Sequence, residues 1–254
     1  MTSNRIILAL VAIVALGVGG YLAYDNVLRG DNVAPLELPS TVPSSGGATS
    51  AAASGSVASA DPTASAASGT TADGSLAGTW SITSGEAGYR VRERLANLPA
   101  ESDAVGRTTA VTGAITLAGS GTSVQLTGGT ISVDTTQIAS DESRRDNRLR
   151  SEGLQTDLFP TASFKLTSPV GIPAAALHGT ATDVTLVGDL TLHGVTKSVE
   201  IPAQAQLVNG TVSVAGSLAF PFADFDITAP NVGGFILSIA DSGTLEFSAS
   251  FTKG

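Results

Sequence analysis

The side chains that could do chemistry are few. The two histidines, His178 and His193, each lie in or beside a predicted turn, and neither belongs to an H-x-x-x-H pattern. Two histidines and a carboxylate can hold zinc, but a turn or strand-edge position is the simpler interpretation. Because the chain has no cysteine, a disulfide, a thiolate metal site and a cysteine nucleophile are excluded. We therefore predict no metal site and no cofactor.

The carboxylates are the remaining candidates for acid and base chemistry. Asp134, Asp146, Asp157 and Asp189 could pair, but carboxylates at strand ends usually cap turns and backbone groups. The glycine-rich piece at 119–121 does not open a helix after a strand, so it is not a nucleotide-binding loop. Without a nucleophile, a base and an orienting group, we predict no catalytic residues and a protein that is not an enzyme. An enzyme that acts on a lipid through Asp146 or Asp189 is kept as an alternative.

The composition limits the classes of molecule that the protein is expected to bind. The 22 acidic residues outnumber the 13 basic ones, which gives a formal charge of -9. This charge opposes binding to nucleic acid, so we expect no such partner. Hydrophobic residues make up 42% of the chain, enough for a sizeable core.

An almost unbroken apolar run, Ile6–Ala23, lies near the start of the chain. At about 1.5 Å per residue it spans roughly 27 Å, close to the thickness of a bilayer core. The run ends near Tyr21 and Tyr24, which suit a membrane interface and favour an uncleaved anchor over a cleaved signal peptide. With Arg5 before it, we predict a cytoplasmic N-terminus at 1–5 and a single-pass transmembrane anchor at 6–24. The rest of the chain is then extracytoplasmic, at the cell membrane.

A change in composition follows the anchor. Ala, Ser, Thr, Gly and Pro dominate from Pro35 to about Ala77. Such a stretch buries too little apolar surface to offset its chain entropy. We predict a disordered linker at 25–77 and a folded domain at 78–254.

The folded domain is organised around Gly188–Pro202, GDLTLHGVTKSVEIP. Apolar and polar residues alternate in each half, which predicts two half-buried strands. The connection is expected at His193–Lys197, with Gly194 at a positive φ. The stretch is therefore a predicted β-hairpin.

The same alternation recurs through the domain. Trp80 and Ile82 form one expected strand, and a second expected strand starts at Tyr89 after the Gly85–Gly88 piece. Asn209-Gly210 predicts a type I′ turn, and a change of phase at Gly128-Gly129 predicts a β-bulge. Further period-two runs are AVTGAITL at 110–117, VQLTGGTISV at 124–133, ASFKL at 162–166, and the runs at 184–192, 199–207, 211–220 and 245–251.

One stretch, Ser140–Gly153, has a helical pattern. Ser140 is the expected cap, acidic residues fill the first turn, and Gly153 is the expected left-handed end. We therefore predict an all-β fold, an antiparallel barrel of about eight strands with one short helical insertion.

An eight-stranded barrel either fills its interior or holds one small ligand, and periodicity does not choose between these outcomes. If the interior is hollow, apolar side chains line it. The candidate ligand-binding residues of such a tunnel are Phe159, Phe164, Leu166, Leu190, Leu192, Phe220, Phe222, Phe225 and Phe235.

Five segments together resemble the YceI family. They are VDTTQI at 133–138, RRDNRLRS at 144–151, LFPTASFKLTS at 158–168, GDLTLHGVTKSV at 188–199 and FADFDI at 222–227. The resemblance implies a lipocalin-like barrel that holds a polyisoprenoid lipid or a quinone in an apolar tunnel, without catalysis. The chain departs from the family at Ser84–Ala87, where a His-Ser pair is usual, and at Arg148, where His is usual.

The resulting hypothesis is a membrane-tethered, extracytoplasmic binding protein whose partners are an isoprenoid-type lipid and the membrane. The alternative is a structural or interaction protein of the cell envelope with a filled barrel core.

Overall fold

The computed structural model describes residues 33–39, 75–96, 101–229 and 236–254. The predicted anchor, Phe235 and most of the predicted linker lie outside these residues. Within the described ranges, none of the helices combines the length and the apolar character needed to cross a bilayer.

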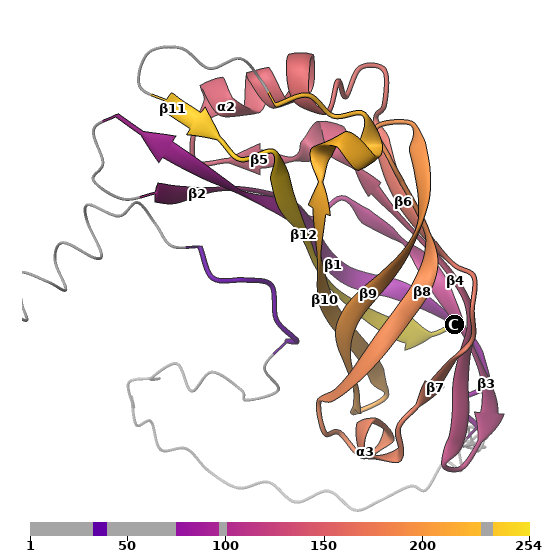
Figure 1. Ribbon diagram of the computed structural model, residues 1–254. Helices are drawn as coiled ribbons and strands as arrows, with labels where there is room; N and C mark the ends of the chain where they lie inside the picture. Colours follow the sequence, from indigo (N-terminus) through magenta and orange to yellow (C-terminus); the bar gives the residue numbers. More distant parts are fainter. Residues whose placement is uncertain (1–32, 40–74, 97–100, 230–235) are drawn as a thin grey trace, which may run out of the picture.

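Eight antiparallel strands form a closed barrel (Figure 1). In spatial order they are β1 (Gly78–Leu95), β3 (Val111–Ser120), β4 (Ser123–Asp134), β6 (Thr161–Leu166), β8 (Thr182–Leu192), β9 (Val195–Val208), β10 (Thr211–Pro221) and β12 (Ser242–Lys253). Pairing of β12 with β1 from Trp80 to Arg90 completes the circle. Closure leaves no free edge around this circle, and it confirms the predicted all-β barrel.

Four short strands extend the barrel at its ends. β2 (Glu101–Thr108) continues the edge of β1 beyond β3, β5 (Ala139–Ser140) pairs with β2, β11 (Ile236–Ile239) pairs with the end of β1, and β7 (Val170–Ile172) pairs with β4. Short helical pieces connect the strands: η1 (Thr135–Gln137), α2 (Ser143–Arg148), η2 (Leu149–Gly153), α3 (Ala174–Leu177) and η3 (Phe222–Phe225).

The first strand differs from its prediction. Gly85–Gly88, expected to separate two strands, lies within the single strand β1, and a bulge between Ile82 and Ser84 shifts its register against β12. The glycines allow close packing here, since a Cβ at Gly88 would lie 2.2 Å from the carbonyl oxygen of Gly106. One continuous strand therefore pairs first with β3 and then with β2.

Two hairpin turns have the left-handed backbone that type I′ turns require. Asn209 and Gly210 have φ values of 51° and 75°, as predicted for this pair. His193 and Gly194 have φ values of 52° and 75°, so the second turn is shorter than the predicted His193–Lys197 connection. Strand β9 already begins at Val195 because a two-residue turn is enough to join twisted neighbours.

The predicted bulge is present, one residue before the glycine pair. Leu117 of β3 faces Leu126 of β4, whereas Thr116 faces Gly128, so Thr127 is the extra residue.

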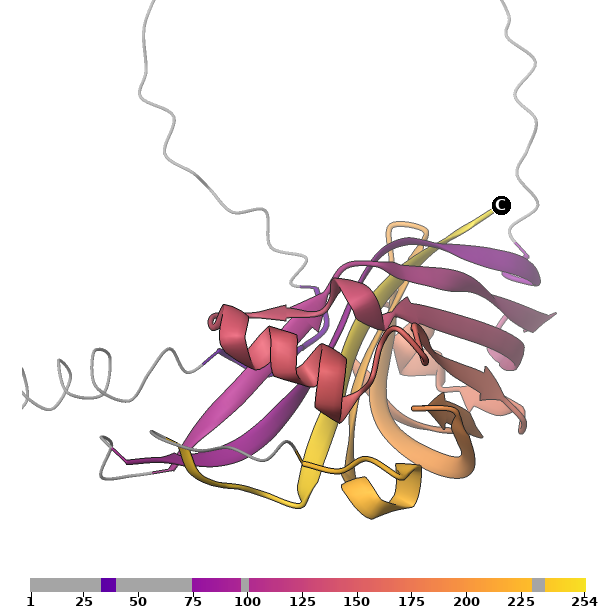
Figure 2. The same ribbon diagram turned by 90° about the horizontal axis from the view of Figure 1, so that it is seen from above.

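The predicted helical insertion is present but its ends differ. The Glu142 side chain, not that of Ser140, accepts the hydrogen bond from the first turn, at the Arg144 N–H. Ser140 belongs to β5 instead. The helix continues as the π-helical turn η2, and the left-handed residue is Gln155 (φ 47°) rather than Gly153. Figure 2 shows α2 and η2 lying across one end of the barrel.

Seven residues of the predicted linker, Val33–Pro39, lie against the outside of the barrel. This differs from the expectation of disorder for that segment. The contacts that hold it are considered in the last part of the Results.

A substitution at Gly188 of β8 can test how tightly the barrel wall is packed. A Cβ there would lie 2.5 Å from the Phe164 ring and 2.4 Å from the Lys165 carbonyl oxygen. We expect Gly188→Ala to lower the free energy of unfolding by about 1–3 kcal/mol, the usual cost of overpacking. Gly171→Ala is the matched control, because nothing lies within 4 Å of its added methyl group. Urea denaturation measures both, and equal losses would contradict the packing described here.

Candidate functional site

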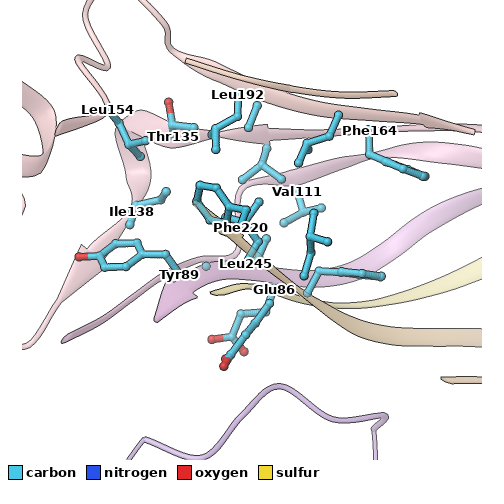
Figure 3. A pocket seen from close by; sticks show the side chains of 18 of the residues that line it. Glu86, Tyr89, Val111, Thr135, Ile138, Leu154, Phe164, Leu192, Phe220 and Leu245 are labelled. Atoms are coloured by element: carbon cyan, nitrogen blue, oxygen red, sulfur yellow. The ribbon is translucent and has the colours of Figure 1, made fainter. Parts of the chain in front are cut away.

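A large cavity occupies the inside of the barrel. Its volume is about 890 Å³, and most of its wall is apolar. The wall comes from alternate residues of the strands, since paired positions such as Tyr89 and Leu245, or Val214 and Ala249, face the same side. Figure 3 shows Val111, Leu192, Phe220 and Leu245 gathered in it. The barrel is therefore hollow.

Most of the predicted tunnel residues line this cavity. They are Phe164, Leu166, Leu190, Leu192, Phe220 and Phe222. Phe159 does not line it and packs edge-on against His193, with ring centroids 4.5 Å apart. Phe225 does not line it either, because it is buried in an apolar cluster with Leu190, Leu192 and Phe220, with its ring packed edge-on against Phe220. Phe235 lies outside the described residues.

Other lining residues were missed by the sequence analysis. They come mainly from strands whose inward parity was unknown, and include Val111, Ile115, Leu126, Leu186, Ile201 and Val214. The period-two pattern identified these residues as one face of a strand. It carried no signal for which face points inward.

The cavity has a polar end under α2. The inward residues Tyr89, Val91 and Glu93 of β1 reach this end, and all three line the cavity. Glu93 is only 4% exposed, and Nη2 of Arg145 donates to its carboxylate at 2.8 Å. Because Arg145 belongs to α2, this ion pair ties the helix to the barrel wall.

Three buried polar atoms near this ion pair have no hydrogen-bond partner among the described residues. They are the Tyr89 hydroxyl, the Ser102 hydroxyl and Nε of Arg145. Ser102 faces Glu93 across the β1–β2 pair, and Tyr89 precedes Glu93 on the same face of β1. A buried polar group without a partner costs about 1–3 kcal/mol, so a bound acceptor or an ordered water would stabilise this end.

The charges at the polar end offset one another. Arg145 also contacts Asp141, and Glu142 caps the helix that carries Arg144 and Arg145. Burial alone would lower the pKa of Arg145, but the charge of Glu93 and the hydrogen bond with Asp141 outweigh it and raise that pKa. Arg145 is therefore a cation whose charge is already compensated by two carboxylates.

Three residues considered for catalysis or metal binding, Asp146, Asp134 and His193, make hydrogen bonds within the fold. Asp146 accepts hydrogen bonds from the Ser140 N–H and hydroxyl, at 2.9 and 2.6 Å. Asp134 accepts from the Thr136 N–H and hydroxyl and caps η1. His193 contacts the Phe225 carbonyl oxygen through Nδ1, 3.1 Å away.

The other candidates are dispersed. His178 ends α3, and Asp189 lies on β8 opposite Ser198. Among the described residues, no group of three or more potential ligands of the His, Asp and Glu types gathers as a metal site. Asp134 and Asp146 therefore hydrogen-bond to backbone N–H groups, as expected of carboxylates at strand ends.

Ionisation of the Tyr89 hydroxyl provides a pH-dependent measurement of the polar end of the cavity. Burial raises its pKa to about 12 from the ordinary value of 10.0. The difference in ultraviolet absorbance between the wild type and Tyr89→Phe is expected to titrate near pH 12. Because the folded-state pKa is the higher one, stability is intact below about pH 10 and is lost progressively up to about pH 12. A Tyr89 titration at pH 10 would show an exposed hydroxyl and contradict the structure.

The Arg145–Glu93 pair gives a second prediction. Arg145→Met leaves Glu93 buried without its partner, which costs about 3 kcal/mol of unfolding free energy. Arg144→Met, an exposed neighbour on the same helix, is expected to change stability by less than about 0.5 kcal/mol. Chemical denaturation at neutral pH compares the two, and the ion pair is unimportant if their midpoints coincide.

Solved structures of known proteins are similar to this chain to different degrees. A polyisoprenoid binding domain from Saccharophagus degradans, implicated in plant cell wall breakdown, has a similar fold, with a TM-score of 0.51 and 17% identity over 69% of this chain and 98% of that one. BcnA of Burkholderia cenocepacia gives a TM-score of 0.46 and 15% identity, over 65% and 95% of the two chains. The YCEI protein of Campylobacter jejuni gives 0.46 and 14%, over 59% and 85%.

A search of curated proteins finds no match. The family model for the YceI-like domain, however, matches residues 80–251. This range runs from Trp80 of β1 to Phe251 of β12 and contains α2 and η2, so the chain belongs to the YceI family.

Proposed function

We propose that this protein is a binding protein for an isoprenoid-type lipid, whose tail lies in the barrel cavity. The observation that carries the proposal is the apolar cavity of about 890 Å³. Ligand pockets commonly have volumes of roughly 300–1,000 Å³. The similar domain from Saccharophagus degradans, described as polyisoprenoid binding, supports the choice of lipid.

The energetics of an apolar tail favour such a site. Burial of about 400 Å² of apolar surface contributes roughly 10 kcal/mol before ordering and association costs are subtracted. Part of the cavity wall is aliphatic, with contributions from Ile115, Leu186 and Val214. A long hydrocarbon tail therefore needs no polar contacts to be held.

The polar end suits an uncharged head group that accepts hydrogen bonds. Tyr89 and Arg145 line this end and have unused donors, and Ser102, which faces Glu93 across the β1–β2 pair, has another. Glu93 with Asp141 already balances the charge of Arg145. A quinone carbonyl or an alcohol matches these donors. Three arginines and three carboxylates line this end and offset one another formally: Arg144, Arg145, Arg148, Glu93, Asp141 and Glu142. A diphosphate would add negative charge to this balance.

The membrane tether is a further part of the proposal. The apolar run Ile6–Ala23 would hold the domain outside the cytoplasmic membrane, where it would carry or store lipid without catalysis. Asp146 and Asp189, the residues on which an enzymatic alternative depended, lie on separate elements, and Asp146 is occupied by Ser140.

The alternative of a structural envelope protein with a filled core has less support. A filled core predicts no pocket of about 300 Å³ or more. The cavity is larger than this limit, and small inward residues such as Ala87, Ala203 and Ala249 leave space across its width.

A plugging variant tests the proposed lipid site. Val214 lines the cavity, so Val214→Trp is expected to reduce binding of a radiolabelled polyprenol by at least about tenfold. Ala219→Trp places the same ring at an exposed position of β10 and is expected to bind normally. The full-length chain in mild detergent is used for both, and circular dichroism checks that each variant is folded. Failure of the wild type to bind any polyprenol or isoprenoid quinone would refute the proposal.

The head-group assignment has its own test. A quinone with an isoprenoid tail is expected to bind more tightly than squalene, which has a tail but no acceptor. Tyr89→Phe with Ser102→Ala should remove that preference and leave squalene binding unchanged. Equal affinities of the wild type for both ligands would leave the tail site standing and overturn the head-group assignment.

A further inference from the structure

The segment Val33–Pro39 contacts the outer wall of the barrel through its backbone carbonyl groups. Nη2 of Arg90 donates to Val33 O at 2.7 Å, and Nη2 of Arg107 donates to Ala34 O. Further along, the Ser248 hydroxyl donates to Glu37 O at 3.1 Å and Nε2 of Gln206 donates to Pro39 O at 3.4 Å. All four donors are outward-facing side chains of the barrel.

These donors lie on strands that follow one another around the wall. Arg107 is on β2, Arg90 on β1, Ser248 on β12 and Gln206 on β9, with β10 between the last two. Three strand spacings from β1 to β9 amount to about 14 Å. The six residue-to-residue steps from Val33 to Pro39 reach roughly 20 Å when extended, enough to cross them. In Figure 1 the segment runs beside the strands β12 and β10.

The segment cannot be an added strand. Pro35 and Pro39 lack the N–H that a ladder needs, so side chains of the wall recognise its carbonyl oxygens instead. Leu36 and Leu38 are half-buried, whereas their neighbours Pro35, Glu37 and Pro39 are exposed. One face of the segment therefore packs against the barrel and the other faces solvent.

The wall beneath the segment contains a buried carboxylate. Glu246 faces outward on β12, yet it is only 5% exposed. Nε of Arg90 donates to it at 2.8 Å and Nη2 of Arg107 at 3.4 Å. The same two arginines donate to Val33 and Ala34, so each bridges the carboxylate and the segment above it.

We propose that this face of β1, β2, β9 and β12 is a docking surface for the chain's own segment Val33–Pro39. Docking attaches the chain to the barrel wall at Val33–Pro39 as well as at the start of β1. Residues 40–74 then connect two points on the barrel, and only residues before 33 connect the barrel to what precedes it. If Ile6–Tyr24 is an anchor, the reach from the membrane to the barrel falls from roughly 180 Å over residues 25–77 to roughly 28 Å over residues 25–32. The docked barrel is then kept close to the bilayer, independently of which ligand the cavity holds.

The segment of the same chain is favoured over that of a second copy. Residues 40–74 are rich in Ala, Ser, Thr and Gly, and their extended length far exceeds the size of the barrel. A connection of this kind gives the attached segment an effective concentration in the millimolar range. A second copy reaches that level only in concentrated solution.

Cysteine cross-linking tests the proposal in the full-length chain, which has no cysteine of its own. Glu37→Cys with Ser248→Cys places two thiols on residues already in contact. A short bis-maleimide is expected to cross-link this pair at least tenfold faster than Glu37→Cys with Lys197→Cys, whose second site is exposed near the β8–β9 turn. The product should be a monomer. Equal rates for the two pairs would overturn the proposal, and so would cross-linked dimers at low protein concentration.

A change within the segment provides a second test that does not disturb the barrel. Leu36→Asp with Leu38→Asp, added to the protein that carries Glu37→Cys and Ser248→Cys, is expected to reduce its cross-linking rate by at least about fivefold. Leu36→Met with Leu38→Met keeps apolar side chains at the same two half-buried positions, so it is the matched control and should leave the rate unchanged. If the double aspartate variant cross-links as fast as the control, the two leucines do not hold the segment on the wall.

Discussion

The pairing of β1 with β12 is the constraint on which the rest of this structure depends. It closes eight strands into a tube, which satisfies the backbone hydrogen bonds without any side chain crossing the interior. A tube of this size is filled only when its inward residues are large. Here several are small, including Ala87, Ala203 and Ala249, so the opposite walls do not meet and a cavity of about 890 Å³ remains.

Closure of the barrel also explains why the short helix α2 contributes a side chain to the site. Glu93 lies on an inward position of β1 because it shares the parity of Tyr89 and Val91, and the interior offers it little water. A carboxylate buried in this way needs a compensating cation, which α2 supplies as Arg145. The same ion pair holds α2 and η2 over one end of the tube. The hydroxyls of Tyr89 and Ser102 and Nε of Arg145 have no partner at that end among the described residues.

The two faces of the wall have opposite chemistry. Inward residues of β1 and β12, such as Val91, Leu245 and Phe251, line an apolar interior, whereas the outward Arg90 and Glu246 form an ion pair on the other side. Strand alternation allows this separation, because successive side chains point to opposite faces. The same two strands can therefore bind an apolar ligand inside and a polypeptide backbone outside.

The sequence by itself determined the barrel class, the Asn209-Gly210 turn, the bulge beside Gly128, the helical insertion and the family, because each depends on local alternation, turn chemistry or a short motif. It also identified six lining residues, among them Phe164 and Phe220. Only the tertiary structure decided which parity faces inward, that Gly85–Gly88 continues a strand, that Phe225 lies outside the cavity, and that Val33–Pro39 lies on the wall. The physical reason is that these features arise from contacts between residues far apart in the chain, such as Glu93 with Arg145 and Arg90 with Val33, and local patterns carry no information about such partners.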